Sequence, residues 1–271
     1  KEDNLRHLIP VIIATAEDRA WRVRLVLAKH FSNLSDSFGQ DITDMSLIQT
    51  LCLLLKDREG DVRGEAAQSL KKCIKNVSVD KIHSLILPLL ATLATDSCVD
   101  VKMSIAYLIG ILGKRLGRET ANQKLIPVLT TLIKDEATIV RVEVMTALKT
   151  LTDIIGEDAF EQTEIQTVLA ALATDFQWRV RLALIDLATD FAQHFGRESF
   201  DKSFEQYFMI YLDDTVYSIR QRGVEQLKVL AKSFGKEWVA GRLIPALSQN
   251  YDTSVGYLCR FNTMRSFASL A

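Results

Sequence analysis

The stretch EDRAWRVRLVLAKHFSNLSDSFG, residues 17–39, contains the pattern that decides the fold. Asp18 is followed five residues later by a valine and six residues later by an arginine, and Gly39 stands 21 residues after it. The same aspartate recurs along the chain at Asp18, Asp57, Asp96, Asp135, Asp175 and Asp214. Successive separations are 39, 39, 39, 40 and 39 residues. A fixed period in this range is typical of a solenoid of stacked repeats.

Three further columns keep the phase of these aspartates. The residues at the fifth and sixth positions after them are Val23, Val62, Val101, Val140, Val180 and Ile219, then Arg24, Arg63, Lys102, Arg141, Arg181 and Arg220. Glycines follow at Gly39, Gly117, Gly156, Gly196 and Gly235, with Ser78 as the exception. Prolines precede the aspartates at Pro10, Pro88 and Pro127, and Pro245 precedes a seventh, imperfect unit.

Each repeat is predicted to be a pair of antiparallel helices. Apolar residues recur at helical spacing in the second helix, as in Val140, Val144, Leu148, Leu151 and Ile155. The glycine is expected to cap this helix, because a left-handed residue costs least there. The proline either bends the first helix or opens it at its first turn. The sequence therefore predicts an all-α solenoid of about seven antiparallel helix pairs.

The period divides the chain into a single array. The predicted repeats are about 1–40, 41–79, 80–118, 119–157, 158–197, 198–236 and 237–271. The last unit is expected to be incomplete, because the chain ends inside its second helix and Ser254 stands where the aspartate should be. We expect further repeats in the native protein, since an uncapped terminal unit exposes an apolar face.

The aspartate and arginine columns have a structural explanation. An aspartate just before a helix can accept the unpaired N–H groups of its first turn. The basic residue six positions on can reach the aspartate of the neighbouring repeat. We therefore predict a ladder of ion pairs along the stack and no active-site role for these columns.

Composition and motifs argue against catalysis. The chain has 33 basic and 34 acidic residues, so its net charge of −1 gives no general attraction to nucleic acid or an anionic membrane. It lacks Gly-x-Gly and phosphate-loop motifs, and its four histidines are scattered. The four cysteines have no paired spacing, which favours free thiols in a reducing compartment. We predict a non-enzymatic, cytoplasmic protein that needs no cofactor or metal.

The turn between the two helices carries the strongest functional signal. The third residues after the aspartates, with the matching position of the seventh unit, are Trp21, Gly60, Val99, Thr138, Trp178, Tyr217 and Tyr257. Arg22 and Arg179 directly follow the two tryptophans. Because Trp, Tyr and Arg dominate interface energies, these turns are predicted to bind proteins. The alternative, that each ring covers the end of its own helix pair, remains open.

The acidic turns of the second and third repeats indicate a second surface. Glu59, Asp61 and Asp100 lie in these turns and suit a partially basic partner.

The period and these turns resemble HEAT repeats, and within them the scaffold subunits of protein phosphatase 2A. The resemblance rests on EDRAWRVR at 17–24, KDREGDVRGEAA at 56–67, WRVRLALIDL at 178–187, VYSIR at 216–220 and FGKEW at 234–238. It implies a non-catalytic scaffold for a Ser/Thr phosphatase catalytic subunit and an interchangeable regulatory subunit. Another HEAT-repeat adaptor, such as a nuclear transport receptor, is the alternative.

The resemblance also implies which residues bind each partner. The catalytic subunit is expected on Trp178, Arg179, Tyr217, Tyr257 and Arg260. The regulatory subunit is expected on Trp21, Arg22, Glu59, Asp61 and Asp100.

Overall fold

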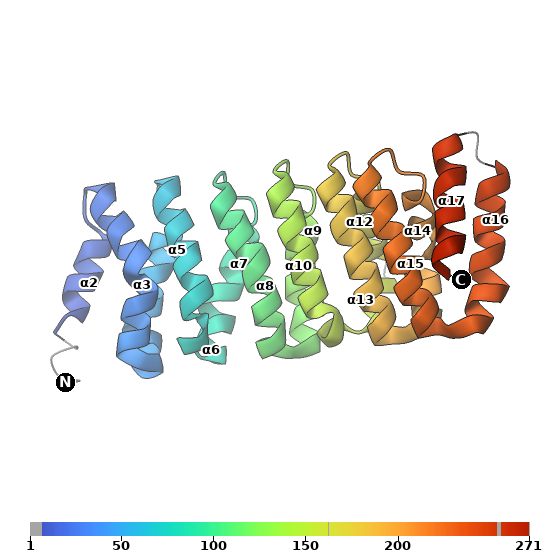
Figure 1. The fold of residues 1–271 in the computed structure, drawn as a ribbon. Coiled ribbons are helices and arrows are strands. Elements are labelled where there is room, and N and C mark those ends of the chain that lie inside the picture. The colour runs from blue at the N-terminus through green and yellow to red at the C-terminus, as the bar shows by residue number, and fades with distance from the viewer. Residues whose placement is uncertain (1–6, 162, 254–255, 271) are drawn as a thin grey trace. The chain divides into compact units, whose positions relative to one another are not determined.

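The computed structural model describes residues 7–161, 163–253 and 256–270, and these residues form helices and turns without a strand. The chain divides into two units, Lys1–Ala147 and Leu148–Ala271, and the boundary falls inside one helix. Figure 1 shows the helices in chain order. The predicted all-α solenoid is confirmed.

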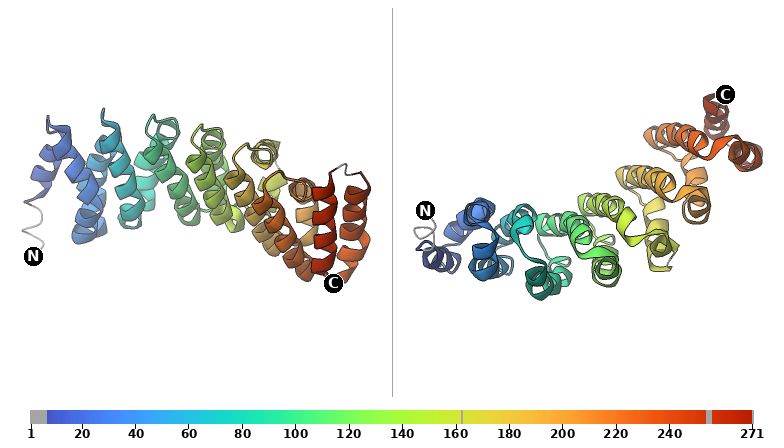
Figure 2. Two further views of the ribbon diagram at one scale, coloured as in Figure 1. Left: turned by 45° about the horizontal axis from the view of Figure 1, so that its top comes forward. Right: turned by 90° about the horizontal axis from the view of Figure 1, so that it is seen from below.

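The first unit contains four helical hairpins. Its helices are α2 (Ile9–Ala16), α3 (Trp21–Ile42), η1 (Thr43–Leu47), α4 (Ile48–Leu54), α5 (Gly60–Cys73), η2 (Ile74–Asn76), α6 (Val79–Lys81), η3 (Ile82–Ile86), α7 (Leu87–Leu93), α8 (Val99–Thr120), η4 (Ala121–Leu125), α9 (Ile126–Leu132) and the start of α10 (Thr138–Ile155). The second helix of one hairpin packs on that of the next, α3 on α5 and α5 on α8. Seen from below in Figure 2, these helices form two layers.

The second unit continues the pattern after α10. Its helices are α11 (Glu157–Glu161), α12 (Thr163–Ala173), α13 (Trp178–Ser203), α14 (Glu205–Tyr211), α15 (Tyr217–Trp238), η5 (Val239–Leu243), α16 (Ile244–Thr253) and α17 (Tyr257–Leu270). Helix α13 packs on α15, and α15 on α17. Burial follows the predicted columns, since Val180 and Ile219 are fully buried.

The predicted glycines mark the ends of the second helices. All five have positive φ, between 78° and 83°. Gly117, with φ 80° and ψ 178°, separates the second helix of one repeat from the first helix of the next within the continuous span of α8. At the exception, α5 ends differently: the 3₁₀ turn η2 follows it, and the Ser78 hydroxyl then accepts the backbone N–H of Lys81 at the start of α6.

Replacing Gly117 with alanine is expected to lower the free energy of unfolding by about 1–3 kcal/mol. Its backbone conformation is essentially restricted to glycine. A Cβ there would meet nothing within 4 Å, so backbone strain alone causes the loss. Gly60→Ala is the control, because its Cβ would meet Cys98 Cβ at an ordinary 3.7 Å. Urea denaturation of both variants measures the difference; equal losses would contradict the assignment.

The prolines lie inside the first helices instead of opening them. The π-helical turns η3, η4 and η5 directly precede the helices that carry Pro88, Pro127 and Pro245 at their second residue. The interpretation that these prolines open a helix is therefore wrong for these three repeats. Proline is not required for the π turn, because η1 precedes α4, which contains no proline.

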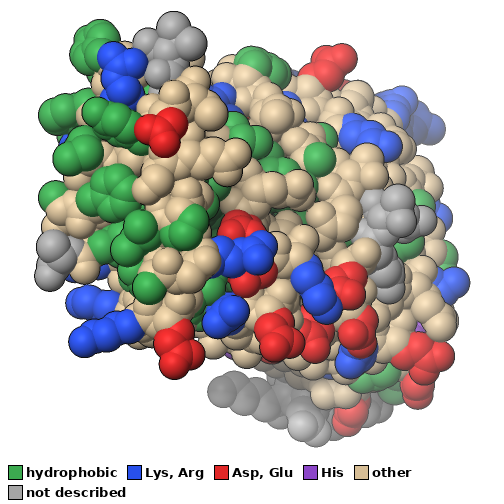
Figure 3. Space-filling view, turned by 90° about the vertical axis from the view of Figure 1, so that its right-hand side faces the viewer, with side chains coloured by type: hydrophobic (Ala, Val, Ile, Leu, Met, Phe, Trp, Pro, Cys, Tyr) green, Lys and Arg blue, Asp and Glu red, His purple; other side chains and the backbone are tan. Residues whose placement is uncertain are grey.

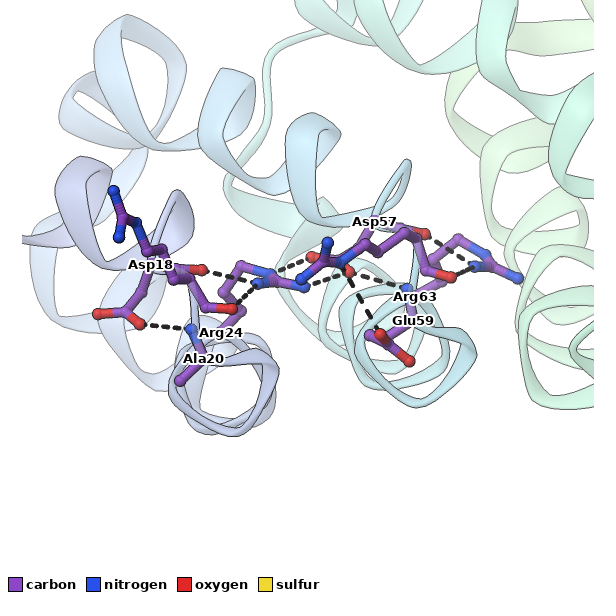
Figure 4. A network of polar contacts seen from close by, with 8 residues as sticks. Asp18, Ala20, Arg24, Asp57, Glu59 and Arg63 are labelled. Carbon is purple, nitrogen blue, oxygen red and sulfur yellow. Dashed lines mark hydrogen bonds and ion pairs between the residues drawn. The ribbon is translucent and has the colours of Figure 1, made fainter.

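An ion-pair ladder joins neighbouring hairpins, as predicted (Figure 4). Arg24 donates from Nε and Nη2 to the two Asp57 carboxylate oxygens, at 2.5 and 2.8 Å, and from Nη1 to the Asp18 carbonyl oxygen at 2.7 Å. Further rungs join Arg63 to Asp96, Lys102 to Asp135 and Arg181 to Asp214. The side chains of all four pairs are between 7 and 14% exposed.

The aspartates bond to the turn and not to the first helical turn, which corrects the sequence prediction. Each carboxylate accepts the backbone N–H two residues later, as Asp18 does from Ala20 and Asp57 from Glu59 (Figure 4). The helix begins one residue further on, at Trp21 and Gly60. This local bond is the Asx turn that aspartate favours, and it orients the carboxylate that the neighbouring arginine binds.

Candidate functional site on the intra-repeat turns

The predicted turn residues are the first residues of the second helices. Trp21, Gly60, Val99, Thr138, Trp178, Tyr217 and Tyr257 begin α3, α5, α8, α10, α13, α15 and α17. The helices start three residues after the aspartate, one earlier than the sequence analysis assumed. The ring positions are therefore fixed by a regular helical backbone and by the Asx turn before it.

Each of the two tryptophans stacks with the arginine that follows it. The Arg22 guanidinium carbon lies 4.9 Å from the Trp21 ring centroid, and that of Arg179 lies 4.8 Å from the Trp178 ring. Both rings are partly buried, whereas both arginines are exposed. Such cation–π contacts hold the guanidinium group in place at a modest gain of about 0.5–1 kcal/mol in exposed sites. Each helix start thus presents an ordered apolar and cationic pair.

The two tyrosines are more exposed than the tryptophans. Tyr217 is 55% exposed and Tyr257 is 72% exposed. The alternative that the ring covers its own helix pair is therefore wrong for both tyrosines. Arg260 is partly buried on α17.

Helix α17 adds an apolar surface that sequence reasoning missed. Leu258, Phe261 and Met264 are 43, 58 and 54% exposed and follow Tyr257 on this helix. Figure 3, which faces the side where α16 and α17 lie, shows hydrophobic side chains gathered in one region and charged ones in another. No sequence signal marks this surface, because apolar residues at these spacings predict burial equally well.

The predicted sites of the first unit differ in their accessibility. Asp61 and Asp100 are exposed, whereas Glu59 is partly buried and lies 3.8 Å from Arg58. Beside Trp21, Arg22 lines a hollow of about 570 Å³. The other lining residues are Thr15, Val23, Val26, Leu27 and His30. Val23 was expected in the buried column but is 40% exposed.

The described residues offer little for chemistry. They contain no group of three or more His, Cys, Asp or Glu side chains that could hold a metal ion. None of the helices among them is both long and apolar enough to cross a membrane. Burial raises the pKa of Cys52 to about 11 and that of Cys73 to about 12, so neither thiol is an activated nucleophile.

The hairpins, their period and the buried ladder define a HEAT-repeat helical solenoid, a fold suited to protein–protein interaction. Residues 40–117 match the family model of the PPP2R1A-like HEAT repeat. Over 93 residues the chain is 36% identical to the beta isoform of the human 65 kDa regulatory subunit of serine/threonine-protein phosphatase 2A. That match covers 33% of the chain and 16% of the human protein.

Solved structures share the fold at low identity. The crystal structure of Kap121p bound to Nup53p matches with a TM-score of 0.74 and 18% identity, over 100% of this chain and 29% of that one. Cex1p matches with a TM-score of 0.68 and 11% identity, over 98% of this chain and 54% of that one. The chain thus spans well under two thirds of these relatives.

Proposed function

We propose that the chain is a non-catalytic scaffold that holds a Ser/Thr protein phosphatase catalytic subunit and a regulatory subunit on its intra-repeat turns. The observation that carries the proposal is the set of ordered rings and guanidinium groups at the helix starts. In the second unit Trp178, Arg179, Tyr217, Tyr257 and Arg260 would bind the catalytic subunit. The similarity to the human 65 kDa regulatory subunit supports the choice of partner.

The first unit would bind the regulatory subunit. Trp21 and Arg22 supply a stacked pair, and Asp61 and Asp100 supply exposed negative charge. Glu59 belongs to the same turn. Because both sites lie on one chain, the second partner binds at a high effective concentration relative to the first. We place this assembly in the cytoplasm, where the free cysteines would stay reduced.

Another adaptor role, such as nuclear transport, is the second candidate. The likeness to Kap121p bound to Nup53p favours it at the level of fold. Mass spectrometry of co-purified proteins separates the two proposals. A Ser/Thr phosphatase catalytic subunit would support the scaffold, and a Ran-like GTPase without a phosphatase would support the transport receptor.

A double substitution tests the catalytic-subunit site. Trp178→Ala with Tyr217→Ala is expected to weaken binding of the purified catalytic subunit by at least about 100-fold, because interface hot spots cost about 2 kcal/mol or more each. Helical melting should change little, since Tyr217 is exposed and Trp178 is only partly buried. Tyr107→Ala on α8 is the control, being an aromatic 42% exposed outside the turns. Unchanged binding, or a collapse of melting, would contradict the proposal.

A further inference from the structure

The ladder has a constant spacing that one arginine breaks. In the rungs Arg24–Asp57, Arg63–Asp96, Lys102–Asp135 and Arg181–Asp214, the carboxylate comes 33 residues after the basic residue. The three arginines of these rungs use Nε and Nη2 for the carboxylate. The residue 33 positions after Arg220 is Thr253, which has no carboxylate.

Arg220 keeps the near half of the rung. Its Nη1 donates to the carbonyl oxygens of Asp214 and Thr215, at 2.6 and 3.0 Å, as the other arginines do in their own turns. The Thr253 hydroxyl donates to the carbonyl oxygen of Gln249 instead. Arg220 is 8% exposed, and its buried Nε has no hydrogen-bond partner among the described residues. A buried donor without a partner costs about 1–3 kcal/mol, so a carboxylate here is favourable.

A second guanidinium group lies beside this position. The Tyr217 ring centroid is 5.8 Å from the guanidinium carbon of Arg220 and 5.9 Å from that of Arg265. Arg265 comes from α17, is partly exposed, and forms no ion pair with the described part of the chain. Tyr217 is 55% exposed, so its ring can rotate to admit a group from solvent.

We propose that Arg220, Tyr217 and Arg265 form a carboxylate clamp that binds an aspartate or glutamate side chain of the protein partner. The partner's carboxylate takes the place that the aspartate of the next repeat has in the other rungs, accepting from Arg220, while Arg265 supplies the second charge. A carboxylate fits better than a phosphate, because the sibling rungs hold this group by the planar fork of a guanidinium. The inference rests on the proposed function only for the identity of the partner.

The clamp can be tested on the chain alone with sodium acetate as the probe. We expect acetate, at matched ionic strength against chloride, to shift the Arg220 Nε–H resonance in NMR spectra saturably, and about tenfold more tightly than it affects exposed Arg19. Arg265→Gln should weaken this response severalfold. A response no larger than that of Arg19 would overturn the clamp. Tighter binding of inorganic phosphate than of acetate would overturn the carboxylate assignment.

An internal carboxylate provides the second test. Thr253→Asp restores the 33-residue spacing, so it should raise the melting temperature by about 2 °C and abolish the acetate response of Arg220. It should also weaken binding of the phosphatase catalytic subunit roughly 10- to 100-fold, since it competes with a charged hydrogen bond. Thr215→Asp, which adds the same charge to an exposed residue of the preceding turn, is the control.

The outcomes separate the two proposals. If the wild-type chain does not bind the catalytic subunit, the proposed function fails, and the acetate titration still decides the clamp. If the catalytic subunit binds Thr253→Asp as tightly as the wild type, the clamp is overturned while the scaffold function stands. Asp252→Asn checks for an acceptor within the chain, and a changed Arg220 resonance in this variant would overturn the role of the partner.

Discussion

Replacing Asp96 with alanine is expected to lower the free energy of unfolding by about 3–5 kcal/mol, because it leaves a buried charge unpaired. Arg63 donates to both Asp96 oxygens at 2.7 Å. The two side chains are 14 and 9% exposed, so water cannot replace the lost carboxylate fully. Urea denaturation followed by circular dichroism measures the loss.

The comparison with an exposed ion pair separates burial from charge. Lys75 and Asp36 lie 3.1 Å apart but are 64 and 49% exposed. Asp36→Ala is therefore expected to cost no more than about 1 kcal/mol. The double variant Arg63→Met with Asp96→Leu should recover most of the loss, since apolar residues often replace a buried ion pair without penalty. Similar losses for Asp96→Ala and Asp36→Ala would contradict the importance of the ladder.

The pH dependence of this loss follows from the pKa of Asp96. Burial alone would raise this pKa, but the hydrogen bonds from Arg63 and from the Cys98 backbone N–H outweigh it and lower the pKa overall. A folded-state pKa below the unfolded-state value of about 3.9 adds stability above that pH. This stability disappears as the pH falls through the folded-state pKa. The gap between the wild type and Asp96→Ala should therefore narrow in acid.

The ladder could be predicted from sequence because both partners belong to the repeat. The period is 39 residues and the basic residue follows its aspartate by six, so a contact between adjacent repeats must join residues 33 apart. Gly117 and Gly196 were predictable for the same reason, since one backbone conformation recurs with the period. Periodic sequence thus carries periodic structure, and no knowledge of side-chain packing is needed.

Contacts that depend on packing between different columns were not predictable. Arg265 approaches Tyr217 from the next hairpin, and its position has no fixed relation to the aspartates. The π-helical turns were missed because η1 forms without a proline to mark it. The predicted departure at Ser254 lies outside the described residues. The binding roles of Trp178, Tyr217 and the other turn residues stay predictions, since a single chain shows exposure and not a partner.

The core of the second unit contains a cluster of phenylalanines from several helices. The Phe191 ring centroid lies 4.7 Å from that of Phe160 and 4.8 Å from those of Phe195 and Phe204. Phe191, Phe160 and Phe204 are fully buried. The cluster joins α11, α13 and the residue between α13 and α14, so it ties two consecutive hairpins together.

Phe191→Ala is expected to cost about 3–5 kcal/mol, because it removes a buried ring and leaves a cavity. Because each repeat of a solenoid contacts only its neighbours, the loss should be local. Hydrogen exchange should therefore accelerate in α11–α14 and change little in α3 and α5. Phe176→Ala, at a residue 77% exposed, is the matched control and should cost under about 0.5 kcal/mol. An equal loss of protection in both units would show that the chain unfolds as one cooperative body and would contradict the nearest-neighbour description.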